Sequence, residues 1–370
     1  MEYIFITSGV TEEETMERTV DLRSDTCTLP TEEMLEATRH AQFGNDAFRE
    51  DPTVNKLEAL AAEKMGKESA LLTVSGTMAN LIALMALTKG GEEVIVEAKA
   101  HMYYNEGRGI SSLARVFYRP IPGHQGALDP GEVEKTIRPI ALRPHDQSKT
   151  TLVCIENTHN NSGGAVIRPE QIKKLHEITQ AYNIKLYLDG ARIFNAAVAL
   201  GIDVREFTKH VDAMMFCLSK GLSAPVGSLL VGSEEFIEKA RWARQEVGGA
   251  MRQAGIIAAS GIVAIEKMVD RLKDDHRNAR ILAGGLAEID GISIEMESVQ
   301  TNIVIFDVSG LGINSDQLVS ALNQRGIKSK TRGKTAVRML THRGVDEEDM
   351  HYALNVVEDV VRKLREHRPI

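Results

Sequence analysis

The sequence predicts an α/β protein in which a mostly parallel sheet, flanked by helices, is followed by a smaller C-terminal α+β domain. Short apolar runs alternate with helical patterns up to about Ile265, and charged helices between short strands follow. The chain has 370 residues, of which 43% are hydrophobic and 26% are charged. A chain of this size and composition can bury one large core and a second, smaller one.

Buried strands are expected where apolar runs are too short for helices. Such runs lie at residues 70–74, 94–96, 152–155, 186–188, 211–218 and 228–231. Helical spacing occupies segments between them, as in 169–182, where Ile172, Leu175 and Ile178 fall on one face. Asp51, followed by a proline, predicts a helix start, because Asp caps a first turn and Pro fits its first position.

The C-terminal part of the chain has a pattern of its own. A charged helix is expected over about 267–283. Three expected strands and two expected helices follow it: 292–294, 303–306 and 336–340, with helices at 316–325 and 346–365. We therefore predict an N-terminal extension over residues 1–20, a large domain over 21–268 and a small α+β domain over 269–370.

Charge and composition exclude several classes of protein. A net charge of −8 argues against a general nucleic-acid binder. The longest mostly apolar stretch, 78–87, is far shorter than the roughly 20 residues of a membrane span. The first 20 residues are acidic and lack the features of a secretion signal, so a cytoplasmic protein is expected. Cys27, Cys154 and Cys217 are far apart, which predicts reduced thiols and no metal site.

Lys220 is the most informative single residue. It follows the apolar run 211–218 and precedes Gly221, so the end of a strand delivers it into a glycine turn. A lysine amine held partly out of water there is prepared to form an imine. Taken alone, the same pattern also fits an exposed turn lysine.

A second feature is the segment Ser75, Gly76 and Thr77, which follows an expected strand and opens an expected helix. Backbone N–H groups at a helix start, with a small residue and two hydroxyls beside them, suit a phosphate group. A plain helix cap with a packing glycine is the alternative.

A third feature is Asp189, which ends the expected strand 186–188. A carboxylate at the carboxyl end of a parallel strand faces the crevice where α/β proteins bind ligands, and there it could pair with a protonated ring nitrogen. A helix cap, or a local pair with Arg192, would also explain it. Together, an imine-forming lysine, a phosphate turn and an acid for a ring nitrogen are the requirements of pyridoxal phosphate (PLP).

The chain resembles the L-threonine aldolases, which are fold-type I PLP enzymes related to the β-eliminating lyases. The resemblance rests on seven segments in order: DLRSDT (21–26), EDPTVN (50–55), SGTMAN (75–80), ENTHN (156–160), DGAR (189–192), LSKGL (218–222) and GGAMRQ (248–253). It resumes at 337–339 and so covers most of the chain. It implies a large domain with a mostly parallel seven-stranded sheet, and a lyase that cleaves L-threonine or L-allo-threonine to glycine and acetaldehyde.

The resemblance also implies which residues bind PLP. Lys220 would form the imine link, and Asp189 would pair with the ring nitrogen. His101 would stack on the ring, and Arg192 would lie near the ring hydroxyl. The phosphate would be held by Ser75, Gly76 and Thr77.

The same resemblance assigns Ser24, Arg192 and Arg338 to the substrate carboxylate, a role for which guanidinium groups are suited. Without the resemblance, Arg338 could simply extend from a strand into solvent.

Three histidines are candidates for the proton acceptor. His101 lies after the expected strand 94–96, and an imidazole titrates near neutral pH. His145, in a loop before the next strand, matches a second histidine often found in the family, although a solvated loop histidine is an equal interpretation. His124 is a weaker candidate.

The resemblance further implies a homodimer or homotetramer with active sites at subunit interfaces, and Arg252 near the phosphate of an adjoining subunit. Three positions depart from the family pattern. Phe48 replaces a common tyrosine, Arg49 adds a charge beside it, and Gln245 replaces a common lysine. These departures bear on activity, on substrate preference and on assembly. Two alternatives remain: a β-eliminating or other amino-acid lyase, which would share Lys220, Asp189 and the phosphate turn, and a catalytically silent relative, which the departures would permit.

Overall fold

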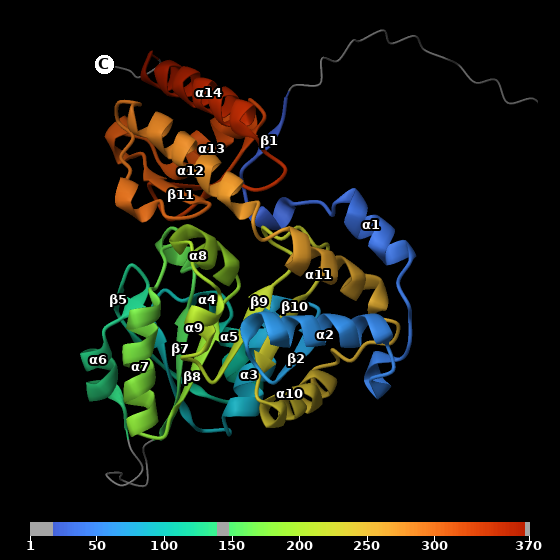
Figure 1. Ribbon diagram of the computed structural model, residues 1–370. Coiled ribbons are helices and arrows are strands. Elements are labelled where there is room, and N and C mark those ends of the chain that lie inside the picture. The colour runs from blue at the N-terminus through green and yellow to red at the C-terminus, as the bar shows by residue number, and fades with distance from the viewer. Residues whose placement is uncertain (1–17, 139–147, 367–370) are drawn as a thin grey trace, which may run out of the picture.

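The computed structural model describes residues 18–138 and 148–366. A large domain built around one sheet carries a smaller domain formed mainly by the C-terminal part of the chain (Figure 1). The large sheet has seven strands in the order β2-β10-β9-β8-β7-β3-β4. All neighbours in it are parallel except β10, which runs antiparallel to both β2 and β9. The predicted mostly parallel, seven-stranded sheet is confirmed.

Six of the seven strands coincide with the predicted apolar runs to within a few residues. They are β2 (Ser69–Thr73), β3 (Glu93–Glu97), β7 (Thr150–Glu156), β8 (Lys185–Asp189), β9 (Ala213–Cys217) and β10 (Ser228–Gly232). The seventh, β4 (Phe117–Ile121), has no such run, because Arg119 and Pro120 interrupt it. Its place at the edge of the sheet explains this, since an edge strand tolerates charge and proline.

Helices cover both faces of the sheet, which is why its central strands are apolar on both sides. One face packs against α2 (Pro52–Met65), α7 (Pro169–Ala181), α8 (Ile193–Leu200) and α11 (Gly255–Lys267). The other packs against α3 (Gly76–Leu87), α5 (Gly107–Leu113) and α10 (Glu234–Glu246). Successive residues of β9 alternate between these two cores, with Met214 in one and Met215 in the other.

The smaller domain is an α+β unit with its own core. Its three-stranded antiparallel sheet has β14 (Ala336–Leu340) between β11 (Ile303–Asp307) and β13 (Lys330–Thr331). The helices are α12 (Leu272–Ala287), α13 (Ser315–Asn323) and α14 (Glu347–Glu366). Apolar side chains of these elements form one buried cluster, so this domain does not depend on the core of the large one.

One strand predicted for this region is absent, and one expected helix is present with shifted bounds. Residues 292–294 do not form a strand, and Ser293 makes only an isolated bridge to Asp307. Gly291, at φ +83°, and a 3-10 turn over Met296–Ser298 leave too few extended residues between them for a ladder. The expected helix 267–283 is also interrupted, because α11 ends at Lys267 and α12 begins at Leu272.

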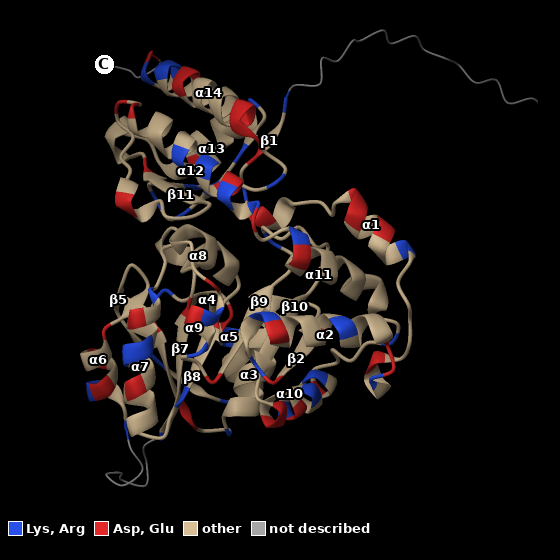
Figure 2. Cartoon of the chain, viewed as in Figure 1, with Lys and Arg blue, Asp and Glu red and all other residues tan. Residues whose placement is uncertain are grey.

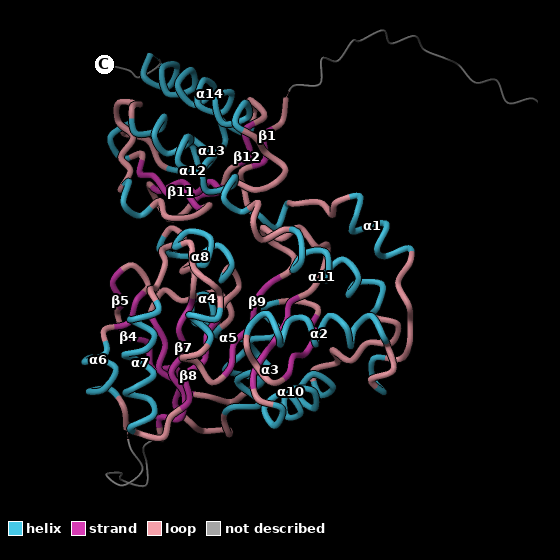
Figure 3. Tube along the Cα trace, in the orientation of Figure 1, coloured by secondary structure: helices cyan, strands magenta, loops and turns pink. Residues whose placement is uncertain are grey.

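The start of the described chain belongs structurally to the C-terminal domain. Strand β1 (Val20–Asp21) pairs in parallel with β12 (Ile327–Lys328), and Figure 3 shows the two strands side by side. Val20 and Leu22 are buried in the core of the small domain. Residues 1–17 of the expected N-terminal extension lie outside the described residues.

Charged residues lie mainly on outward-facing helices such as α10 and α14, while the sheet between the helices is largely uncharged (Figure 2). Across residues 18–138 and 148–366, no helix combines the length and apolar character that crossing a bilayer requires.

Candidate active site

A cavity of about 350 Å³ lies where β7, β8 and β9 end and the small domain meets the large one. The carboxyl ends of parallel strands are the usual ligand site of such sheets. Nine residues predicted for the site line this one cavity: Ser24, Ser75, Gly76, Thr77, His101, Asp189, Arg192, Lys220 and Arg338. They come from six separate stretches of sequence, so the fold brings them together.

Lys220 lies three residues beyond the end of β9, in a turn that is fixed by hydrogen bonds. Its carbonyl oxygen accepts hydrogen bonds from the Oγ1 of Thr28 at 3.0 Å and from the backbone N–H of Ser223 at 2.9 Å. Glycine fits closely at the next position, because a Cβ on Gly221 would lie 2.8 Å from Cδ2 of Leu272, which would have to move. The turn therefore holds the backbone of Lys220 still while its side chain lines the cavity.

Asp189 ends β8 and is buried, in register beside Met215 on β9. Its Oδ2 accepts a hydrogen bond from Asn80 Nδ2 at 2.9 Å, and its Oδ1 accepts one from the Ala191 N–H at 3.1 Å. No basic side chain of the described residues forms an ion pair with it. Burial raises the pKa of Asp189 to about 6, and the nearby carboxylates of Glu156 and Glu106 add to the rise. A buried carboxylate without a cationic partner fits a ligand that brings a positive charge, such as a protonated pyridine nitrogen.

Ser75 caps the N-terminus of α3 by accepting a hydrogen bond from the Met78 N–H at 3.2 Å. A Cβ on Gly76 would lie 2.8 Å from Met215 Cε and 2.9 Å from Cys217 Sγ. Glycine therefore lets the start of α3 rest against β9 without displacing these two side chains. The first N–H groups of α3 precede its intrahelical hydrogen bonds and point toward the cavity end of the helix, an arrangement that fits a phosphate.

His101 opens the short helix α4 (His101–Tyr104), and two glutamates hold it. Its Nδ1 lies 2.9 Å from Oε1 of Glu106, and its backbone N–H donates to Glu156 Oε2 at 2.6 Å. Burial lowers the pKa of His101, but the Glu106 carboxylate and the charges of Asp189 and Glu156 outweigh that effect and raise it above the usual value.

Glu106 links His101 to the ring-nitrogen end of the site. Besides His101, it accepts hydrogen bonds from Thr77 Oγ1 at 2.9 Å and from Asn80 Nδ2 at 3.1 Å. Asn80 also donates to Asp189, so a continuous polar chain joins the histidine to the buried aspartate. The hydroxyl proton of Thr77, a residue predicted for the phosphate, is thus donated to Glu106.

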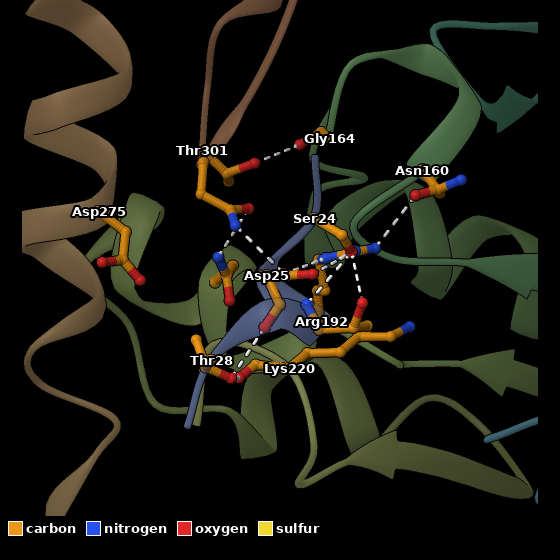
Figure 4. A network of polar contacts seen from close by, with 12 residues as sticks. Ser24, Asp25, Thr28, Asn160, Gly164, Arg192, Lys220, Asp275 and Thr301 are labelled. Atoms are coloured by element: carbon orange, nitrogen blue, oxygen red, sulfur yellow. Dashed lines mark hydrogen bonds and ion pairs between the residues drawn. The ribbon is translucent and has the colours of Figure 1, made fainter. Parts of the chain in front are cut away.

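The two arginines predicted for a carboxylate lie together, and Figure 4 shows the Arg192 guanidinium between Asp25 and Asn160. Arg192 donates to both oxygens of Asp25, from Nε at 2.6 Å and from Nη2 at 2.7 Å, and from Nη1 to Asn160 Oδ1 at 3.2 Å. Arg338 on β14 donates from Nη2 to the same Asn160 oxygen at 2.7 Å. The buried Nε of Arg338 has no hydrogen-bond partner within the described parts of the chain. The pair therefore retains the capacity to bind an anion.

Burial lowers the pKa of Arg338 to about 10, and the positive charges of Arg192 and Arg332 contribute. Ser24 lies beside this pair, where it caps a short 3-10 turn by accepting hydrogen bonds from the N–H of Thr26 at 3.2 Å and from its hydroxyl at 2.8 Å.

Sequence reasoning gave no role to Asp25, Asn80, Glu106 or Asn160. Asp25, Asn80 and Asn160 lie inside segments that carried the family resemblance, so that signal could have found them. Glu106 lies outside those segments, and only its contacts reveal it.

Two predicted residues line other hollows, and one lies outside the described residues. His145 lies outside the described residues. His124 belongs to the two-residue strand β5 (Gly123–His124) and lines a separate hollow with Val166 and Arg168. Arg252 lines another cavity, of about 720 Å³, whose walls include all three departures from the family pattern: Phe48, Arg49 and Gln245.

Comparison with known proteins identifies the family. Residues 21–309 match the family described as beta-eliminating lyase. The chain belongs to this family. A member from Arabidopsis thaliana, low-specificity L-threonine aldolase 1, is 39% identical over 352 residues, which cover 94% of this chain and 98% of that protein. The predicted family and the lyase class are therefore confirmed.

Two solved structures share the fold of this family member. The threonine aldolase of Leishmania major superposes with a TM-score of 0.79 at 19% identity, covering 92% of this chain and 98% of that one. A structure of SPT with PLP superposes with a TM-score of 0.71 at 19% identity, covering 94% of this chain and 88% of that one. The predicted fold class, that of the fold-type I enzymes, is confirmed.

Proposed function

We propose that this chain is a PLP-dependent aldehyde-lyase that cleaves L-threonine and L-allo-threonine to glycine and acetaldehyde. One observation carries the proposal: Lys220, a buried Asp189 without a cationic partner, and the arginine pair Arg192 and Arg338 share one cavity. The lysine and the aspartate suit PLP, and the arginines suit an amino-acid carboxylate. The names of the Arabidopsis relative and of the Leishmania structure agree with this reaction.

The residues that would hold PLP follow from the cavity. Lys220 would supply the amine that links to the cofactor, Asp189 the anion for its ring nitrogen, and the start of α3 the N–H groups for its phosphate. When bound, PLP acts as an electron sink that stabilises negative charge at the α-carbon of the amino acid.

The arginine pair would orient the substrate. A carboxylate bound by Arg192 and Arg338, with the Ser24 hydroxyl beside them, fixes one end of the amino acid relative to Lys220. Orientation then decides which bond at the α-carbon is broken, because only one bond can be aligned with the electron sink. The ion pair with Asp25 keeps Arg192 in place without occupying all its donors.

His101 is the described residue best placed to accept the proton of the β-hydroxyl group, directly or through a water molecule. Its Nδ1 faces Glu106, so the other ring nitrogen is the one that remains for the substrate. Glu106 would stabilise the imidazolium that forms. The β-hydroxyl proton leaves, the Cα–Cβ bond breaks, the aldehyde departs, and a proton added at the α-carbon gives glycine. His145 remains a second candidate for this role.

The test is incubation of the purified, PLP-loaded protein with L-threonine and, separately, with L-allo-threonine, measuring glycine, acetaldehyde, 2-oxobutyrate and ammonia. Equal amounts of glycine and acetaldehyde support the proposal. Formation of 2-oxobutyrate and ammonia would instead identify a β-eliminating lyase, the reaction after which the family is described. The absence of all four products, together with failure of the protein to develop a visible absorption band when PLP is added, would identify a catalytically silent relative.

The proposed assembly is a homodimer or homotetramer with active sites at subunit interfaces. Phe48 and Trp242 are 71% and 74% exposed in the single chain and line one cavity with Arg252. Large exposed apolar side chains of this kind suit a subunit contact. Sedimentation of the loaded protein tests this proposal, and a monomer that remains active would contradict it.

We also propose a cytoplasmic location. Cys27, Cys154 and Cys217 are free thiols, as a reducing compartment favours. Fractionation of the cells that produce the protein tests the location.

A further inference from the structure

Two basic side chains at the substrate end of the cavity have no role in the proposed reaction. Lys330 and Arg332 line the cavity together with Thr331 between them, and all three come from the small domain, at β13 and the turn that follows. Neither basic side chain forms an ion pair with a carboxylate of residues 18–138 or 148–366. Most other basic groups around the site are paired or assigned, so these two are in excess.

The strand register places Lys330 next to the carboxylate-binding arginine. Lys330 and Arg338 are direct partners in the antiparallel pair of β13 with β14, so their side chains extend from the same face of this sheet. Like charges in directly opposite positions destabilise a sheet unless an anion lies between them. The positive charges of Arg192 and Arg332 also contribute to the lowered pKa of Arg338, so Arg332 lies close enough to Arg338 to repel it.

Arg332 reaches toward the helix that carries His101. Its guanidinium carbon lies 5.7 Å from the centre of the Tyr104 ring, at the end of α4. That contact is within the range of a cation–π interaction and links the small domain to the helix that His101 opens. Lys330 therefore lies beside Arg338, and Arg332 lies near the end of the helix that His101 opens, while both residues line the same cavity.

Three carboxylates line the cavity, those of Glu106, Glu156 and Asp189, and none of them forms an ion pair with Lys330 or Arg332. Glu106 accepts from His101, Thr77 and Asn80, and Glu156 accepts from the N–H groups of His101 and Asn160. The α-carboxylate of an amino acid supplies one negative charge, which Arg338 and Arg192 receive. A substrate with a neutral side chain leaves Lys330 and Arg332 without an anion.

We propose that Lys330 and Arg332 form a second anion site, and that the preferred substrates are β-hydroxy-α-amino acids whose side chain carries a carboxylate. This inference rests on the proposed aldehyde-lyase function. For 3-hydroxyaspartate, the β-hydroxyl loses its proton, the Cα–Cβ bond breaks, and the α-carbon gains a proton. The products are glycine and glyoxylate, so no further reactant is needed.

The kinetic test compares kcat/KM for 3-hydroxyaspartate with that for L-threonine. Lys330→Gln and Arg332→Gln are each expected to lower the ratio of the two values about tenfold, equivalent to loss of one partly shielded charge contact. Lys334→Gln is the matched control, because Lys334 is exposed in the same turn and does not line the cavity. It is expected to leave the ratio unchanged. A ratio that moves less than about twofold in both cavity variants would overturn the inference.

A binding measurement separates this inference from the proposed function. L-Aspartate and L-asparagine have nearly the same shape, differ in one charge, and lack the β-hydroxyl group that cleavage needs. Calorimetric titration of the loaded protein is expected to show tighter binding of L-aspartate, with the difference reduced in Arg332→Gln. Equal binding of the two ligands would contradict the second anion site, whether or not the enzyme cleaves L-threonine. If no β-hydroxy amino acid is cleaved but L-aspartate is preferred, the proposed reaction is wrong and the anion site stands.

Discussion

The Nδ1 atom of His101 lies 2.9 Å from the Oε1 atom of Glu106, and Glu106 lies on the polar chain that leads through Asn80 to Asp189. This contact orients the imidazole and leaves its other nitrogen for the substrate. It also opposes the effect of burial on the titration of His101, whose pKa is raised as a result. The protonation of His101 is therefore set by a neighbour that does not itself perform the proposed proton transfer.

Replacing Glu106 by glutamine is expected to move the acid limb of the pH profile to lower pH. Only a neutral imidazole accepts a proton, so kcat/KM should rise as the pH increases through the pKa of His101. Loss of the carboxylate removes a contact that raises this pKa, and the midpoint therefore falls. The pH dependence of kcat/KM for L-threonine, measured in the parent protein and in the variant, gives this midpoint. An unchanged midpoint in the variant would show that His101 is not the group that titrates.

Replacing Lys220 by alanine is expected to remove the visible absorption band of bound PLP and to lower turnover at least about 1,000-fold. The reason is that the only amine positioned by the β9 turn is lost. Absorption spectra and glycine production measure the two effects. Lys173→Ala, at an exposed position on α7, is the matched control and should retain both properties. Full turnover in the Lys220 variant would refute the assignment of this lysine.

Replacing Asp189 by asparagine should retain the absorption band but lower turnover by about 100-fold or more. Asparagine keeps the shape and accepts the Asn80 hydrogen bond, but it cannot supply the negative charge that keeps a ring nitrogen protonated. Spectra and kcat, measured side by side, distinguish this outcome from simple loss of the cofactor. Equal kcat in the variant and the parent protein would mean that the buried charge has no electronic role.

Replacing Asp25 by asparagine should lower the free energy of unfolding by about 3–5 kcal/mol, because it leaves the buried Arg192 guanidinium without a counter-ion. Burial raises the pKa of Asp25, but Arg192 outweighs it and the net pKa is lowered well below the usual range. The stability that this pair contributes is therefore present above the usual pKa of an aspartate, about 3.9, and is lost as the pH falls toward the folded-state value.

Urea unfolding of the Asp25 variant near neutral pH measures this effect. Asp203→Asn is the control, since Asp203 pairs with Arg205 at the surface and should matter little. A variant of Asp25 as stable as the parent protein would contradict the role of the pair.

The large sheet could be predicted because its strands are buried on both faces and so form uninterrupted apolar runs. Strand β4 was not predicted, because its position at the edge of the sheet permits Arg119 and Pro120, which interrupt the apolar run. The strand predicted over residues 292–294 was wrong. The apolar pattern there resembles that of a strand, but the flanking turns leave only the isolated bridge between Ser293 and Asp307. The local apolar pattern indicates which residues are buried. It does not indicate how many strand residues can pair between the turns on either side.

The site was predictable where a side chain directly follows a strand or opens a helix, as Lys220, Asp189 and Ser75 do. The role of Glu106 could not be predicted, because it depends on contacts with residues that lie 5 to 29 positions away in the sequence. Lys330 and Arg332 were also unpredictable, since only the pairing of β13 with β14 shows that they face the cavity beside Arg338.

The pairing of β1 with β12 has a consequence for the synthesis of the protein. Val20 and Leu22 emerge from the ribosome early, yet the partners that bury them are translated some 300 residues later. Ser24 and Asp25 follow directly, so the carboxylate-binding end of the site cannot assemble until Arg338 has left the exit tunnel. During most of translation Val20 and Leu22 lack their native neighbours, so this segment stays exposed to chaperones and to aggregation until the small domain is made.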